Sequence, residues 1–172
     1  MARAFVGVGS NIEPAENVKK ALRLLAQETR LAAISTVYET EPEGRPEQPR
    51  YYNCVVEIDT EASPAELKRA LRGIEERLGR VRTEDRCASR TIDLDVLAYD
   101  DLSVQTPDLT LPDPDIATRA YLATGLTELA PALTLPGIGL AAAELAKKLP
   151  KRGMRPLPEY TAALRSEVIH GS

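Results

Sequence analysis

The sequence predicts an α+β domain built around one antiparallel sheet. Short segments rich in β-branched residues and two amphipathic segments follow one another as strand, helix, strand, strand, helix, strand. Further helical segments come after this unit, toward the C-terminus. This order lets both helices pack on one face of the sheet, which is the arrangement of a ferredoxin-like sandwich. The chain has no internal repeat or linker, so we expect one domain over residues 1–172.

The first elements follow from apolar patterning and proline positions. Residues 4–8 form an apolar run typical of a buried strand, and Pro14 suits the first turn of a helix that extends to about Gln27. Residues 31–39 predict the second strand and residues 52–59 the third. A loop with three prolines and a glycine separates these two strands.

The second helix is the best-marked element in the chain. Ser63 is the expected N-cap, Pro64 fits the first helical position, and Glu66 completes a capping box. Gly79 suits the end of the helix. Its apolar stripe consists of Leu67, Ala70, Leu71, Ile74 and Leu78.

Residues 90–99 predict the last strand of the unit. With a period of two, Asp93 and Asp95 lie on one face. The opposite face consists of Ile92, Leu94 and Val96. The Cα atoms of the two aspartates would be roughly 6.6 Å apart, so their carboxylates can converge on hard divalent cations. By itself, the stretch is equally compatible with the solvated face of an amphipathic strand.

The segment before this strand favours the metal interpretation. Four arginines lie within eleven residues, Arg80, Arg82, Arg86 and Arg90. Cations beside paired carboxylates are typical of a site where a polyphosphate and its metal ions lie between them.

The second half of the chain carries weaker signals. Residues 101–106 suggest a short strand or hairpin arm, and the prolines of 111–115 interrupt regular structure. Helices are predicted over 118–129 and 140–148. The tail, 150–172, is weakly patterned and is expected to be peripheral.

Composition excludes several classes of function. The net charge is −4, so no overall basic field favours nucleic acid. Two cysteines are too few for a disulfide scaffold or a zinc site, and His170 is the only histidine. No signal peptide or bilayer-spanning apolar stretch is present, so we expect a cytoplasmic protein with no membrane partner.

Five motifs occur in one order along the chain. They are Gly9-Ser10-Asn11, Tyr38-x-Thr40-Glu41-Pro42-x-Gly44, Gln48-x-x-Tyr51-x-Asn53, Gly79-Arg80-x-Arg82, and Arg90-Thr-Ile-Asp93-Leu-Asp95. Together, over roughly residues 4–135, they resemble the 6-hydroxymethyl-7,8-dihydropterin pyrophosphokinase family. The resemblance implies a ferredoxin-like fold and a magnesium-dependent transfer of pyrophosphate from ATP to the hydroxymethyl oxygen of the pterin. It further implies release of AMP and a place in folate biosynthesis.

The resemblance also implies roles for individual residues. Asp93 and Asp95 would bind two Mg²⁺ ions, while Arg80 and Arg90 would be catalytic and bind the ATP phosphates. Other ATP contacts would come from Glu75, Arg82, Thr110 and Arg119. Pterin contacts would come from Tyr51 and Tyr121 as aromatic walls, Asn53 at the heterocycle edge, and Thr40, Glu41 and Glu43.

Other interpretations compete with these assignments. Tyr51 and Tyr121 also suit half-buried core or rim positions, and Asn53 also suits a turn in which it bonds the backbone. A non-catalytic relative that binds pterin or nucleotide is one rival function. An RNA-binding ferredoxin-like module is another, although a single Phe and the negative net charge disfavour it. A monomer that binds small molecules is the expected form.

The sequence departs from the family pattern on the nucleotide side. Cys87-Ala88-Ser89 replaces a usual Trp-Gly-Pro, Thr83 replaces a frequent lysine, and Asp113-Pro114 replaces His-Tyr. These changes leave the aspartate pair and the pterin residues intact. We therefore expect them to affect ATP affinity rather than the type of reaction.

Overall fold

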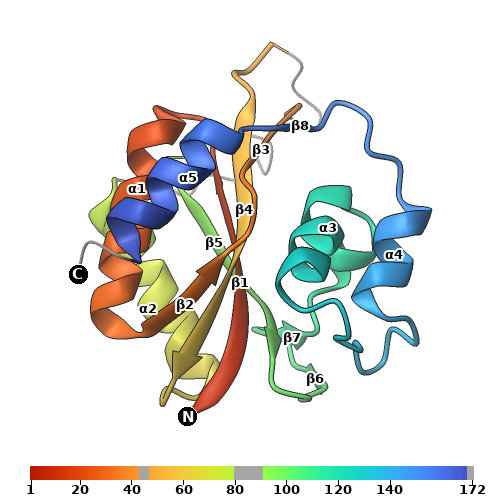
Figure 1. Ribbon diagram of the computed structural model, residues 1–172. Coiled ribbons are helices and arrows are strands. Elements are labelled where there is room, and N and C mark those ends of the chain that lie inside the picture. The colour runs from red at the N-terminus through yellow and green to blue at the C-terminus, as the bar shows by residue number, and fades with distance from the viewer. Residues whose placement is uncertain (43–46, 80–90, 170–172) are drawn as a thin grey trace.

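A computed structural model describes residues 1–42, 47–79 and 91–169 of the chain (Figure 1). Its strands are β1 (Ala2–Ser10), β2 (Arg30–Ile34), β3 (Tyr38–Thr40), β4 (Tyr51–Thr60), β5 (Asp93–Tyr99), β6 (Val104–Gln105), β7 (Thr110–Leu111) and β8 (Arg155–Pro156). Its helices are α1 (Pro14–Glu28), α2 (Pro64–Arg77), the 3₁₀-helix η1 (Pro114–Ala117), α3 (Ala120–Leu129), α4 (Ala142–Lys148) and α5 (Pro158–Val168).

The main sheet confirms the predicted fold class. Its strand order is β5-β1-β4-β3-β8, with β2 also paired to β4, and every pairing is antiparallel. The strands before and after α1 and α2 therefore interleave as a ferredoxin-like sandwich requires. The predicted caps of α2 are also present, because Ser63 and Glu66 form a reciprocal capping box and Gly79 has a φ of 83° just beyond the helix.

The single strand predicted over 31–39 is wrong, since β2 and β3 are separate strands on the same edge of β4. Ser35 lies at the interruption. Its backbone N–H donates to the Val55 carbonyl at 2.8 Å, while its hydroxyl accepts from the Val55 N–H at 2.9 Å. A side-chain oxygen thus replaces a backbone acceptor of the ladder, which lets the chain bend without leaving β4 unpaired.

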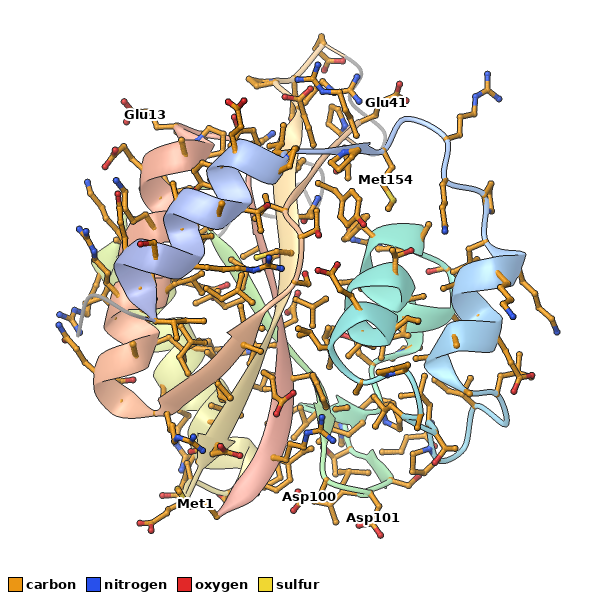
Figure 2. The ribbon with its side chains drawn as sticks, in the orientation of Figure 1. Met1, Glu13, Glu41, Asp100, Asp101 and Met154 are labelled. Carbon is orange, nitrogen blue, oxygen red and sulfur yellow. The ribbon has the colours of Figure 1, made fainter. Side chains whose placement is uncertain are left out.

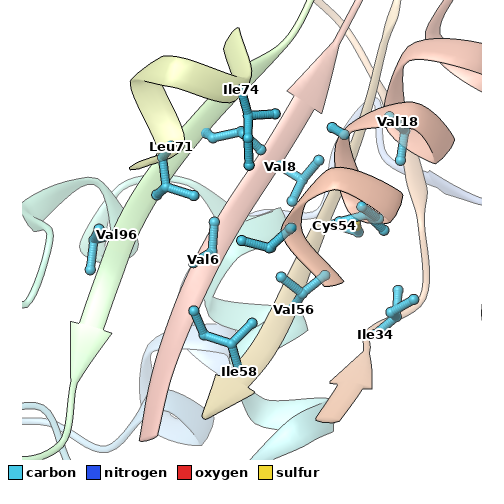
Figure 3. Close-up of a cluster of buried hydrophobic side chains, with 14 of the residues drawn as sticks. Val6, Val8, Val18, Ile34, Cys54, Val56, Ile58, Leu71, Ile74 and Val96 are labelled. Atoms are coloured by element: carbon cyan, nitrogen blue, oxygen red, sulfur yellow. The ribbon is translucent and has the colours of Figure 1, made fainter. Parts of the chain in front are cut away.

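Helices cover both faces of the sheet, whereas the sequence placed two helices on one face. Helices α1, α2 and α5 lie on one side in Figure 1, and α3 and α4 lie on the other. Figure 3 shows the first side, where Val6, Val56 and Leu71 belong to one buried cluster. Phe5, Val55 and Leu97 point the other way and pack in a second cluster with α3 and α4. The second face is apolar over this length and therefore needs its own cover.

The C-terminal region is more regular than its sequence pattern indicates. The predicted hairpin arm is confirmed, because β6 pairs with β7. The tail contains β8 and α5, and α5 buries Thr161, Leu164 and Val168. Among the described residues, no helix combines the length and the apolar character needed to cross a bilayer.

Candidate active site

A polar pocket lies where the central strands meet η1 and the start of α3. Residues from β1, β4 and β5 form one side, and residues from η1 and α3 form the other. The lining residues are Gly7, Val8, Gly9, Asn53, Asp93, Asp95, Leu97, Asp113, Asp115, Arg119, Tyr121 and Leu122.

The strand alternation of β5 directs both aspartates into this pocket. Leu94 and Val96 are each 5% exposed in the core, whereas Asp93 and Asp95 line the pocket on the opposite face. On the neighbouring strand, Gly9 is paired with Asp93 and Gly7 with Asp95. Because glycine has no side chain, Leu97 and Leu122 can pack against β1 at Gly7, and Asn53 can pack against it at Gly9.

The buried carboxylate of Glu75 on α2 binds the backbone of β5. Its side chain is 2% exposed, and Oε2 accepts a hydrogen bond from the Leu94 backbone N–H at 2.9 Å. This carboxylate fixes the start of the strand between the two aspartates. Glu75 is not among the residues that line the pocket, so its predicted contact with nucleotide stays a prediction.

Two further acids, Asp113 and Asp115, line the pocket and were not predicted as site residues. Asp113 caps η1, and its Oδ1 accepts from the Asp115 N–H at 2.9 Å. The pKa of Asp113 is raised, mainly by burial, although the hydrogen bond from the Asp115 N–H and the charge of Arg119 oppose the rise. The sequence shows the Asp-Pro-Asp signal, but only the fold brings it opposite β5.

The pocket residues fit divalent metal ions. The acidic residues of the pocket come from β5 and from η1 with its N-cap, and they present the oxygen donors that Mg²⁺ prefers. Within the described residues, no group of three His, Cys, Asp or Glu side chains could by itself hold a metal ion. Mg²⁺ is commonly bound through one or two carboxylates, water and substrate phosphates, so the aspartate pair suits that mode.

Next to Gly9, the pocket presents the side-chain amide of Asn53. Asn53 is 8% exposed, and its Nδ2 donates to the Thr40 hydroxyl at 2.7 Å, which fixes the orientation of the amide. A Cβ on Gly9 would lie 2.5 Å from Asn53 Oδ1 and 3.8 Å from Cδ1 of Tyr51. The amide therefore lies directly against the β1 backbone, with Tyr51 nearby. Such an edge can both donate to and accept from a flat heterocycle.

Arg119 and Tyr121, at the start of α3, line the opposite side of the pocket. Arg119 Nη1 donates to the Tyr121 hydroxyl at 3.1 Å, and Nη2 lies 3.9 Å from Asp115 Oδ2. The arginine thus holds the tyrosine and places a positive charge among the acids of the pocket.

The structure brings together part of the predicted set. Asn53, Asp93, Asp95, Arg119 and Tyr121 share the pocket, and Thr40 joins them through Asn53. Thr110 on β7 and Glu41 are both exposed and are not lining residues. Tyr51 and Glu75 are described but do not line the pocket either. The other four predicted residues lie outside the described residues: Glu43, Arg80, Arg82 and Arg90. The sequence departures Thr83 and Cys87-Ala88-Ser89 lie outside them too.

Comparison with known families gives one clear match. The family model described as 7,8-dihydro-6-hydroxymethylpterin-pyrophosphokinase (HPPK) matches residues 5–131. All the pocket-lining residues, from Gly7 to Leu122, fall inside this range.

Two curated relatives agree with that match, and one solved structure has a similar fold. The chain is 39% identical over 159 residues to the 2-amino-4-hydroxy-6-hydroxymethyldihydropteridine pyrophosphokinase of Pseudomonas aeruginosa, covering 91% of this chain and 97% of that protein. It is 33% identical over 172 residues to the folic acid synthesis protein fol1 of Schizosaccharomyces pombe, covering 98% of this chain but 23% of that protein. The crystal structure of Plasmodium falciparum HPPK-DHPS superposes with a TM-score of 0.69 at 14% identity. That match covers 86% of this chain and 43% of the solved chain, so this chain spans less than half of its length.

Proposed function

The chain belongs to the 7,8-dihydro-6-hydroxymethylpterin-pyrophosphokinase family, and on this premise we propose that it transfers pyrophosphate from ATP to 6-hydroxymethyl-7,8-dihydropterin. The products are AMP and the pterin pyrophosphate, and the reaction belongs to folate biosynthesis. The observation that carries this proposal is the family match over 5–131, which spans every residue of the polar pocket.

The proposed reaction is a displacement at phosphorus. The hydroxymethyl oxygen of the pterin forms a bond to the β-phosphorus of ATP. The bond from that phosphorus to the oxygen it shares with the α-phosphate breaks, the hydroxyl gives up its proton, and AMP leaves. Most of the catalysis in such a transfer comes from positioning and from stabilising charge on the phosphate oxygens.

We assign Asp93 and Asp95 to the binding of two Mg²⁺ ions. Both carboxylates line the same pocket, beside Gly7 and Gly9 of the neighbouring strand, which supports this assignment. Bound magnesium would neutralise the negative charge of the phosphates and hold them in line with the attacking oxygen. The positions of the two aspartates would thereby determine where the phosphates lie relative to the pterin.

We assign the part of the pocket around Asn53 to the binding of the pterin. Tyr51 and Tyr121 would stack on the two faces of the ring, and Asn53 would bond its edge. The hydrogen bond from Asn53 to Thr40 supports this role, because it presents a fixed amide. Glu41 and Glu43 are proposed as further contacts on this side, Glu43 on the family resemblance alone.

We assign ATP contacts to Arg119, which lines the pocket, and to Glu75 and Thr110, which do not. Arg80, Arg82 and Arg90 are proposed as further phosphate ligands, with Arg80 and Arg90 catalytic, on the family resemblance. We also propose that residues 1–172 form one domain that acts as a cytoplasmic monomer.

Product analysis tests the proposal directly. The purified protein is mixed with ATP, Mg²⁺ and 6-hydroxymethyl-7,8-dihydropterin, and the nucleotide products are separated. We expect AMP and pterin pyrophosphate in equal amounts, and no product when pterin is omitted or magnesium is chelated. If the protein bound both ligands but formed no AMP, the result would contradict the proposed activity and favour a non-catalytic relative. Tight RNA binding without pterin binding would instead favour the ferredoxin-like RNA-binding module.

A further inference from the structure

The C-terminal segment lies along the strand that carries part of the proposed pterin subsite. β8 pairs antiparallel with β3, with Glu39 opposite Arg155. The Leu157 N–H donates to the Val37 carbonyl at 2.9 Å, and the Val37 N–H donates to the Thr161 hydroxyl at 2.9 Å. The tail thus satisfies both backbone groups of the residue before β3 and pairs with the outer edge of β3.

Arg50 connects this tail to both sides of Thr40. Its Nη2 donates to the Gly153 carbonyl at 2.7 Å, and its Nε lies 3.2 Å from Glu39 Oε1. Its Nη1 is 3.9 Å from Glu41 Oε1. Glu39 and Glu41 flank Thr40 in the chain, and Arg50 itself precedes Tyr51. The Arg50 guanidinium therefore links the two residues that flank Thr40 to the C-terminal tail, from a position directly before Tyr51.

Gly153 makes the close approach of the tail possible. Its φ is +73°, and a Cβ at this position would lie 2.9 Å from Cδ of Glu41. Figure 2 shows Glu41 and the neighbouring Met154 at the same end of the molecule. Any side chain at residue 153 would be strained by this positive φ, and the exposed Glu41 side chain would have to shift.

We propose that Arg50, through its bonds to Gly153 and Glu39, is a positioning residue for the pterin, and that the C-terminal segment supports the pterin subsite. This inference rests on the proposed function, because it takes Thr40, Tyr51 and Asn53 as pterin contacts. Thr40 holds the amide of Asn53, so a displacement of β3 is transmitted to the group that meets the heterocycle edge. β5, which carries the aspartates, is separated from β3 by β1 and β4, so ATP binding is unaffected.

The test compares three arginine variants in the full-length protein. Arg50→Ala should raise the KM for pterin roughly three- to tenfold, the range expected from losing an exposed charged network, with the KM for ATP and kcat unchanged. Arg50→Lys should recover only part of the loss, because an ammonium lacks the forked geometry. Arg30→Ala is the matched control, since Arg30 is an exposed arginine of the same sheet that pairs with Asp59 at 2.8 Å, away from β3. It should change neither KM.

A second measurement removes stability as an explanation. Pterin affinity is titrated with each variant in the presence of magnesium and a saturating non-hydrolysable ATP analogue, beside a thermal unfolding curve. Gly153→Ala should weaken pterin binding as selectively as Arg50→Ala does. Unchanged pterin affinity in both variants, or equal losses for pterin and ATP, would overturn the inference. AMP formation by the unmodified protein tests the proposed function separately, whatever the ligand affinities of the variants are.

Discussion

Neighbouring residues on β4 and β5 face opposite environments, and their comparison separates stability from chemistry. On one face, Leu94, Val96 and Cys54 are buried beneath the helices of the first core cluster. On the other face, Asp95 and Asn53 line the polar pocket. A shift of one residue along a strand thus moves from the core to the site. Substitutions at adjacent positions should therefore impair different properties, activity on the pocket face and stability on the core face.

Asp95→Asn should lower kcat roughly 10³-fold, because it removes one of two proposed magnesium ligands, an interaction worth several kcal/mol in the transition state. The free energy of unfolding should change by less than about 0.5 kcal/mol, since the side chain is exposed and its removal opens no cavity. Steady-state kinetics and urea unfolding measure the two quantities. Near-normal turnover in magnesium would contradict the metal assignment.

Leu94→Ala, one residue away, should show the reverse pattern. It creates a cavity in the core and should lower the free energy of unfolding by about 3 kcal/mol. At a temperature where the variant remains folded, kcat should change far less than in Asp95→Asn. Denaturant unfolding and turnover on the same sample give both numbers. If activity fell as far as in Asp95→Asn, the division between the two faces of β5 would be wrong.

Asn53→Ala should weaken pterin binding by about 2 kcal/mol, the usual effect of leaving a polar partner unsatisfied. The affinity for ATP should barely change, because Asn53 lies on β4, beyond β1 from the aspartates. Titrations with each ligand distinguish the two sites. Equal losses for pterin and ATP would mean that Asn53 supports the fold and does not bind the heterocycle.

The thiol of Cys54, the next residue on β4, should be unreactive in the folded protein. It is 2% exposed, and burial raises the pKa of its thiol to about 12. At pH 8 almost none of it is thiolate, so a maleimide should not label it. In a Cys87→Ser background, labelling should appear only after unfolding in urea. Rapid labelling of the native protein would show that this face of β4 is open.

Local signals were sufficient for much of the fold. The capping box of α2 joins residues three apart, and the alternation of β5 depends only on the period of a strand. The aspartate pair was found in the same way, by residue type and spacing, whereas Asn53 was found through the family resemblance. By contrast, Leu157 at the N-cap of α5 makes no side-chain cap bond, and the helix is stabilised by burial against distant segments. Its sequence pattern alone was therefore too weak to predict it.

The sequence by itself determined the order of strands and helices along the chain, the apolar and polar faces of β5, and the aspartate pair of the site, because each depends on neighbours a few positions apart. Only the tertiary structure decided three other features. The ladder is interrupted at Ser35 by a bond to Val55, Asp113 and Asp115 lie opposite β5, and Arg50 reaches Gly153 of the tail. Each of these joins residues far apart in the chain, and such contacts exist only once packing has brought the segments together.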